Sequence, residues 1–213
     1  MAITTALTAC SKPSDEQTII GRSDIKVENG RLTPEALWAF GRLGDMQVSP
    51  DGKQIAYGVS YYSVPENRSN REIFVMNSDG SAEQQITHSA KSEYSARWVK
   101  DGTKIAFLTS ESGDIQLWEM NPDGTERTQI TTRAGGITDY LYAPNGKQIL
   151  LIANIPFGKR TSDHYPDLDK ASGFVVDELM YKHWDEWTTS IPHPFLVDYD
   201  GSQVSHERDF LAG

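Results

Sequence analysis

The sequence predicts an all-β chain built from a repeated four-stranded unit, and three observations support this. Three similar segments place Asp-Gly or Asn-Gly beside an apolar run, and their glycines, Gly52, Gly102 and Gly146, are 50 and 44 residues apart. A second set of Asp-Gly turns, at Gly80, Gly124 and Gly201, interleaves with the first. The composition also favours strands and turns, because the 213 residues include 17 Gly, 10 Pro, 5 Trp and 9 Tyr.

The spacing of these turns predicts a partial β-propeller of about three four-stranded blades. Asp-Gly or Asn-Gly between apolar runs is the strongest short-range hairpin signal, because glycine tolerates a positive φ. The middle repeat divides into strands over 96–99, 104–109, 116–121 and 127–131. One such meander in each ~40–45 residues is typical of a propeller blade. Continuous apolar runs at 105–109 and 149–153 predict strands that are covered on both faces.

Two helices are expected in addition to the blades. The first is short and lies before the repeats: Thr33 is its N-cap, Pro34 its first residue, and Gly41 follows its end. The second, over 174–188, lies in an insertion of the third repeat that covers about 156–190. We expect residues 1–30 to be a processed leader and a flexible tether, and residues 31–213 to form an incomplete propeller domain.

Charge and residue content exclude several classes of function. There are 20 basic and 30 acidic residues, a net charge of −10, which disfavours binding to nucleic acid or adsorption to an anionic membrane surface. The single cysteine excludes an internal disulfide. The five histidines lack zinc-protease spacing and no phosphate-binding glycine loop is present, so we expect no metal and no cofactor. The aspartates that precede the turn glycines are expected to form turns: Asp51, Asp79, Asp101 and Asp123.

Cys10 is the candidate site of a lipid anchor. Leu7-Thr8-Ala9-Cys10 resembles a bacterial lipobox, and the polar residues 11–17 suit a tether. No Lys or Arg precedes Cys10, which departs from a signal peptide, so a short apolar N-terminus with an unrelated cysteine is the alternative. The lipobox predicts a periplasmic or outer-membrane lipoprotein in the cell envelope of a Gram-negative bacterium, in contact with the membrane only through this lipid.

Residues 32–38 followed by 48–57 resemble the opening of the propeller domain in the prolyl oligopeptidase family of serine peptidases. The most similar members are bacterial dipeptidyl peptidases and acylaminoacyl peptidase-like enzymes, and the insertion over 177–187 is similar to a segment of that subgroup. The resemblance implies a propeller that covers an α/β-hydrolase domain with a Ser-Asp-His triad. This chain contains no Gly-x-Ser-x-Gly motif, so we name no catalytic residue in it and expect the natural protein to continue past Gly213 into that domain.

Glu178, Asp185 and Glu186 are the candidate substrate-binding carboxylates. The resemblance implies that acidic residues on a helix of the insertion bind the free α-ammonium group of a peptide, because a desolvated ammonium needs anionic acceptors. The alternative is a solvated helix face on which Glu178 pairs with Lys182, four residues later.

Tyr181 and Trp184 are the candidate aromatic residues of the same site. They either line a substrate cavity or fix the insertion to its own blade. The implied function is a substrate-gating and substrate-selecting propeller of a secreted serine exopeptidase that releases short peptides from the N-terminus, with this chain inactive alone. The alternative is a non-enzymatic, TolB-like periplasmic propeller that binds proteins.

Overall fold

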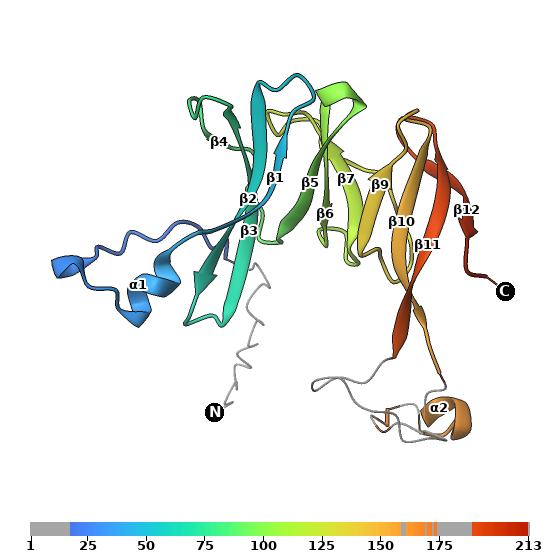
Figure 1. Ribbon diagram of the computed structural model, residues 1–213. Coiled ribbons are helices and arrows are strands. Elements are labelled where there is room, and N and C mark those ends of the chain that lie inside the picture. The colour runs from blue at the N-terminus through green and yellow to red at the C-terminus, as the bar shows by residue number, and fades with distance from the viewer. Residues whose placement is uncertain (1–17, 159–160, 169, 172, 174–188, 213) are drawn as a thin grey trace, which may run out of the picture.

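Three four-stranded antiparallel sheets follow one another along the chain, each with its strands in sequence order. The computed structural model describes residues 18–158, 161–168, 170–171, 173 and 189–212. The three sheets stand side by side as successive blades (Figure 1). The predicted partial β-propeller is therefore confirmed.

Each blade is a simple meander. The first blade contains β1 (Arg42–Val48), β2 (Gln54–Ser63), β3 (Arg68–Asn77) and β4 (Gln84–Gln85). The second contains β5 (Glu93–Val99), β6 (Lys104–Thr109), β7 (Gln116–Met120) and β8 (Thr128–Gln129). The third contains β9 (Asp139–Tyr142), β10 (Gln148–Pro156), β11 (Ser190–Tyr199) and β12 (Val204–Asp209).

The aspartates of the turns shape the hairpins as the sequence predicts. Asp51 Oδ1 accepts a hydrogen bond from the Lys53 amide at 3.1 Å, and Asp123 Oδ1 accepts one from the Thr125 amide at 3.0 Å. These bonds are the local side-chain-to-backbone contacts that favour Asp in turns. Gly124 has φ = +85°, and a Cβ there would lie 2.3 Å from the Ile86 carbonyl oxygen. Glycine is thus required for the turn and for the approach of the first blade.

The strand β6 shows why the middle repeat reads as a continuous apolar run. Its Ile105 and Phe107 are fully buried in a core shared with the first blade. Its Ala106 and Leu108 are fully buried in a second core shared with the third blade. Because alternate side chains of a strand point to opposite faces, a blade between two others buries both.

The third blade buries one face more fully than the other. Ile149, Leu151 and Ala153 on β10 are buried against the second blade. Leu150, which lies between them, is half-buried, and its cross-strand neighbour Leu141 is 59% exposed. Among the described residues, the apolar run over 149–153 therefore has one fully buried face and one that is only partly covered.

The first strand of the second blade is longer than the sequence predicts. It starts at Glu93, and a β-bulge between Tyr94 and Arg97, with Ser95 at φ = +55°, interrupts the alternation of its side chains. A bulge adds an unpaired residue and so hides the two-residue period on which a sequence prediction depends. The last strand, β8, is correspondingly shorter than predicted, with only two residues.

The short N-terminal helix α1 (Pro34–Ala39) forms as predicted, beside the first blade (Figure 1). Thr33 Oγ1 accepts a hydrogen bond from the Ala36 amide at 3.2 Å, which is the N-cap contact. The chain is already extended at Phe40, before the expected glycine. Gly41 is needed instead for close approach, since a Cβ there would lie 2.7 Å from a methyl group of Val59.

Three shorter helical elements complete the described structure. They are the 3-10 turns η1 (Glu28–Gly30) and η2 (Lys100–Gly102) and the helix α2 (Thr161–His164) in the third-blade insertion. Asp101 lies within η2 at φ = +52°, so it belongs to a turn as expected. The predicted helix over 174–188 lies outside the described residues.

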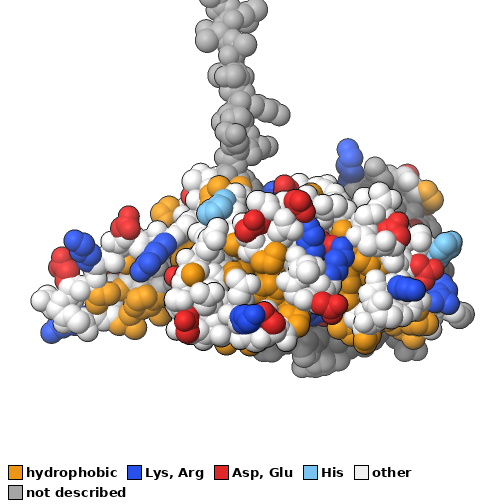
Figure 2. Space-filling view, turned by 90° about the horizontal axis from the view of Figure 1, so that it is seen from above, with side chains coloured by type: hydrophobic (Ala, Val, Ile, Leu, Met, Phe, Trp, Pro, Cys, Tyr) orange, Lys and Arg blue, Asp and Glu red, His pale blue; other side chains and the backbone are white. Residues whose placement is uncertain are grey.

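Acidic and basic side chains are interspersed on the molecular face shown in Figure 2, with hydrophobic side chains between them. The ion pairs of the protein include Arg127–Glu111 and Lys104–Glu126. On this face the basic side chains are scattered among acidic ones and do not form a stripe.

Candidate functional site

All the substrate-binding residues predicted from the sequence lie outside the described residues, and so does Cys10. The predicted substrate residues are Glu178, Tyr181, Trp184, Asp185 and Glu186. The structure does describe the base from which their segment leaves the third blade. This base, the neck, consists of residues 153–156 of β10 and 190–193 of β11.

The neck is a regular two-stranded ribbon. The strands β10 and β11 pair without interruption from Gln148–Asp198 to Pro156–Ser190. One further hydrogen bond, from the Phe157 amide to the Thr189 carbonyl at 2.9 Å, closes the ribbon. The chain therefore enters and leaves the insertion at adjacent points, which fixes where the predicted site begins relative to the blade.

A partly buried histidine joins the neck to the outer strand of its blade. His193 on β11 lies 2.8 Å from Asp209 on β12, measured from Nδ1 to Oδ2. Its ring stacks on Phe195 with 6.3 Å between ring centres. The hydrogen bond from His193 holds the pKa of Asp209 below its usual value. The guanidinium of Arg133, from the second blade, lies over the Phe195 ring, 4.4 Å from its centre.

The described part of the insertion exposes apolar and aromatic side chains. Helix α2 continues into two tight turns, in which the Leu168 amide bonds to the Tyr165 carbonyl at 2.9 Å. Phe157, Tyr165 and Leu168 are all about half exposed. These side chains give the insertion a surface that can contact apolar parts of a peptide or another protein surface.

A second group lies beside the first blade and contains Trp38 on α1, Arg42 on β1 and Tyr62 on β2; Trp38 and Arg42 are exposed, and Tyr62 is half-buried. The guanidinium of Arg42 lies 5.0 Å from the ring centre of Trp38 and 4.3 Å from that of Tyr62. The two rings are 5.5 Å apart. The hairpin of β2 and β3 and the neck both extend toward the same side of the molecule, past the short hairpin of the second blade (Figure 1). Arg42 and Tyr62 were not predicted, because no motif marks them and only packing brings them to Trp38.

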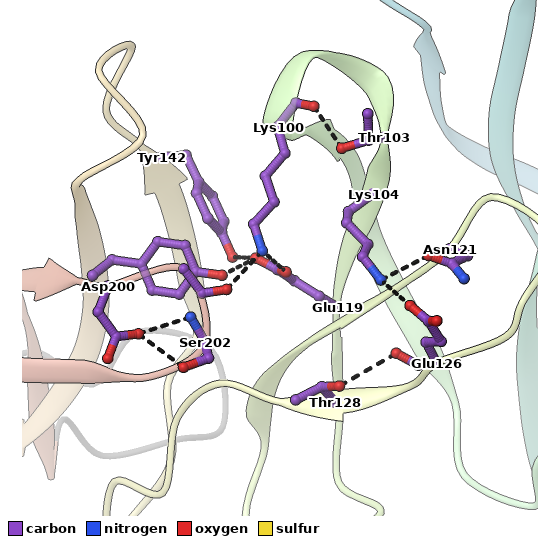
Figure 3. A network of polar contacts seen from close by, with 12 residues as sticks. Lys100, Thr103, Lys104, Glu119, Asn121, Glu126, Thr128, Tyr142, Asp200 and Ser202 are labelled. Carbon is purple, nitrogen blue, oxygen red and sulfur yellow. Dashed lines mark hydrogen bonds and ion pairs between the residues drawn. The ribbon is translucent and has the colours of Figure 1, made fainter.

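At the end of the third blade opposite to the neck, a buried carboxylate ties the second blade to the third. Glu119 on β7 is 3% exposed and accepts three hydrogen bonds (Figure 3). Lys100 Nζ donates to Oε2, and the hydroxyls of Tyr142 and Tyr199 donate to Oε1, each at 2.7 Å. Burial and the nearby carboxylate raise the pKa of both tyrosines, so the hydroxyls keep their protons. The network holds the two blades in a fixed relation.

One serine, histidine and aspartate group lies on the third blade, but its geometry is not that of a catalytic triad. Ser205 Oγ and Asp198 Oδ2 both lie 3.3 Å from the same ring nitrogen of His206, Nδ1. A triad uses the two ring nitrogens separately, one for the serine and one for the carboxylate. The His206 side chain is also 80% exposed. This group therefore cannot activate the serine in the manner of a serine peptidase.

Within the described residues, no group of three or more His, Cys, Asp or Glu side chains could hold a metal ion. In the same part of the chain, none of the helices has the length and apolar character needed to span a bilayer.

Comparison with known proteins gives the family. The family model described as the TolB beta propeller domain matches residues 41–163, more than half of the chain. The chain belongs to this TolB β-propeller family. The match covers all of the first two blades and the first two strands of the third.

Two curated relatives of this TolB-family propeller are named dipeptidyl-peptidase 5. The protein from Porphyromonas gingivalis is 48% identical over 182 residues, which cover 85% of this chain and 27% of the relative. The protein from Porphyromonas endodontalis is 41% identical over 186 residues, which cover 87% of this chain and 27% of the relative. The TolB-family propeller thus spans about a quarter of the length of these proteins.

Solved structures agree with the fold. The acylaminoacyl peptidase of Pyrococcus horikoshii matches with a TM-score of 0.56 and 16% identity, over 81% of this chain and 25% of that one. At this identity the match shows a shared fold. The resemblance to peptidase propellers inferred from the sequence is confirmed, whereas the lipid anchor at Cys10 stays a prediction.

Proposed function

We propose that this TolB-family chain is the substrate-selecting propeller portion of a secreted serine exopeptidase that releases short peptides from the N-terminus of its substrates. The similarity to two proteins named dipeptidyl-peptidase 5, at 48% and 41% identity over most of this chain, carries the proposal. The shared fold with an acylaminoacyl peptidase supports it. In this proposal the catalytic α/β-hydrolase domain, with its serine nucleophile, lies in a part of the full-length protein beyond Gly213.

The proposed task of the third-blade insertion is to bind the free amino end of the peptide. One or more of Glu178, Asp185 and Glu186 would accept hydrogen bonds from the α-ammonium group, while Tyr181 and Trp184 would line the cavity beside it. A charge-assisted contact of this kind is strong where water is excluded. Fixing the amino end at a set distance from the nucleophile would determine how many residues are released.

The described neck supports this role because it gives the insertion a defined origin. Nine consecutive cross-strand pairs hold β10 and β11 together, and the His193–Asp209 contact joins β11 to β12. Binding groups must be held within a fraction of an ångström of their productive positions, which needs such a rigid support. The Trp38–Arg42–Tyr62 group beside the first blade is a second surface that would face substrate or the hydrolase domain.

The proposed domain plan assigns residues 1–30 to a leader and tether and residues 31–213 to the propeller. Cys10 would carry the lipid that keeps the protein in the cell envelope, on the periplasmic side or at the outer membrane. Labelling the full-length protein in cells with a fatty-acid analogue tests this assignment. Incorporation should require Cys10 and disappear in a Cys10→Ala variant, whereas label that persists in that variant would rule out this anchor.

The decisive experiment on function measures peptide hydrolysis by the full-length protein. Glu178→Ala, Asp185→Ala and Glu186→Ala are compared on a dipeptidyl substrate with a free amine and on the same substrate with its amine acetylated. Loss of a contact to a buried ammonium should lower kcat/KM for the free amine by about tenfold or more. The acetylated substrate should be unaffected by the same variant. Equal kinetics on both substrates in all three variants would contradict the proposed amine site.

A non-enzymatic propeller that binds protein partners is the second candidate, favoured by the TolB family match over residues 41–163. A serine-directed inhibitor distinguishes the two. We expect the full-length protein to hydrolyse dipeptidyl substrates in an inhibitor-sensitive manner and the 213-residue chain alone to be inactive. Inhibitor-sensitive hydrolysis by the 213-residue chain would contradict the placement of the nucleophile, and an inactive full-length protein would favour the binding function.

A further inference from the structure

Two buried carboxyl groups meet between the first and second blades. Glu72 on β3 is 1% exposed and Glu93 on β5 is fully buried. The two strands meet at this point, because the Arg71 amide, one residue before Glu72, donates to the Ser92 hydroxyl, one residue before Glu93, at 3.1 Å. Carboxylates are almost never buried without compensation, because removing a charge from water is costly. This pair needs a physical explanation that neither the fold nor the proposed function supplies.

Neutral donors surround Glu72. The Thr87 hydroxyl donates to Oε2 at 2.7 Å, and the Asn70 side-chain amide donates to Oε1 at 2.6 Å. The Ser89 backbone amide adds a third bond to Oε1 at 3.3 Å. These donors satisfy both oxygens of Glu72 but bring no positive charge.

Glu93 has a single cation as partner. Arg127 Nη2 lies 3.1 Å from Glu93 Oε1, but the same nitrogen lies 2.6 Å from Glu111 at the surface. The second oxygen of Glu93, Oε2, is buried and accepts no hydrogen bond from any described residue. A proton held between the two carboxyl groups would satisfy this oxygen and remove the excess negative charge.

The second blade repeats the hydrogen bonds around Glu72, but with a glutamine in place of the glutamate. Gln116 occupies on β7 the place of Glu72 on β3. In each blade the hydroxyl of a threonine 15 residues later, Thr87 or Thr131, donates to this side chain at 2.7 Å. The same hydroxyl accepts a hydrogen bond from the backbone amide of the residue that follows the glutamate or glutamine. Gln116 also donates from Nε2 to the Arg133 carbonyl at 2.7 Å. The acidic version of this repeated position thus occurs only in the first of these two blades.

The other titratable and charged groups around the pair are few. Arg127, from the segment before β8, contacts Glu93, and the exposed Glu111 contacts Arg127. On β2, burial raises the pKa of the Tyr61 phenol, and the charge of Glu72 adds to this effect. His88 and Lys91 belong to the connection that carries Thr87 and Ser89. Arg127 is therefore the one cation in direct contact with Glu72 or Glu93 among the described residues.

We propose that Glu72 and Glu93 share one proton, and that this proton makes the contact between the first and second blades dependent on pH. With the proton present, one carboxyl donates to the other, and the remaining charge is balanced by Arg127. With the proton removed, two buried carboxylates repel each other across the blade interface. The blades should then separate locally more often.

The direction of the pH effect follows from linkage. Burial and the charge of Glu72 raise the pKa of Glu93 to about 7, and burial raises that of Glu72 as well. A carboxyl with a raised pKa holds its proton in the folded state after the opened state has lost it. The stability of the interface therefore falls as pH rises from the ordinary glutamate value toward 7, and the fall is complete above it.

Hydrogen–deuterium exchange of the full-length protein at pH 6 and pH 8 tests this proposal, with rates corrected for the intrinsic effect of pH. A carboxyl with a pKa of about 7 in the closed state and the ordinary glutamate value in the opened state makes the opening constant about tenfold larger at pH 8 than at pH 6. We expect this change in peptides that cover β3 and β5. Peptides that cover β9 and β11, at the second interface, should not show it.

Two conservative variants and one control complete the test. Glu93→Gln and Glu72→Gln should each abolish the tenfold change, because an amide supplies the shared hydrogen permanently. Glu72→Gln also reproduces the side chain that folds in the second blade, which protects the test against failure to fold. Glu126→Gln, a surface carboxylate paired with Lys104, should retain the change. A pH response that persists in both glutamine variants, or that is equal at both interfaces, would overturn the proposal.

Discussion

The two blade interfaces solve the same electrostatic problem differently. At the second interface, Glu119 is buried with a lysine and two tyrosine hydroxyls directed at it. At the first, Glu93 shares its only cationic partner, Arg127, with a surface glutamate, and its second oxygen accepts no hydrogen bond from the described residues. A buried carboxylate adds to stability only when every oxygen has a donor and its charge is balanced. The comparison indicates that the second interface is built for rigidity and the first for a response to protons.

The Glu119 network should give the largest effect of a single polar substitution. Glu119→Gln can still accept the two tyrosine hydroxyls, but its amide group then faces Lys100, so a donor faces a donor. We expect local opening of the second interface to become easier by about 2–4 kcal/mol, the cost of breaking a buried charged contact. Amide exchange of β7 and β11 at pH 7 measures this quantity. Unchanged protection would mean that the two interfaces do not differ as described.

Adding the missing carboxylate to the second interface should make it resemble the first. In Gln116→Glu, the new carboxylate faces the Arg133 carbonyl, to which the native amide donates at 2.7 Å. An unpaired buried charge raises the pKa of the group, so the variant should destabilise β7 by about 2 kcal/mol at pH 8 and by less at pH 5. Exchange rates at the two pH values test this, with Glu72→Gln as the reverse substitution. A loss independent of pH would contradict the electrostatic explanation.

The paired threonines sharpen the comparison further. Thr87→Val and Thr131→Val remove equivalent buried hydroxyls, each of which donates at 2.7 Å, one to Glu72 and one to Gln116. Each loss should cost about 1–2 kcal/mol, and the cost at Thr87 should be the larger one if Glu72 is ionised, since charge-assisted bonds are stronger. With the proton on Glu72, the two costs should be equal. Amide exchange of β3 and β7 at pH 6 and pH 8 distinguishes these cases.

The smallest effect is expected at the surface of the second interface. Glu207 lies 3.3 Å from Arg133 and is 41% exposed, and the guanidinium of Arg133 also rests on Phe195. Glu207→Gln should change the stability of the interface by about 0.5 kcal/mol or less, because solvent screens exposed ion pairs. A thermal unfolding midpoint within error of the wild type is the expected result. A large decrease would mean that surface pairs, and not buried ones, hold the blades together.

Much of the fold is local in origin and could be predicted. The turn glycines and aspartates act within a few residues, as does the Thr33 cap of α1, so the blades, their order and the first helix follow from short segments. The bulge after Tyr94 was missed because an extra residue disrupts the two-residue period without leaving a sequence signal. Arg42 and Tyr62 were missed because their contact with Trp38 depends on how α1 lies against β2.

The sequence by itself determined the repeated blade, the long insertion of the third repeat and the family resemblance, since each depends on residues close together in the chain. Only the tertiary structure decided which polar groups meet between the blades. Tyr199 and Glu119 are 80 residues apart, and Arg127 and Glu93 are 34 apart. Such contacts form because neighbouring blades bury their facing side chains together, and no local pattern records which groups will face each other.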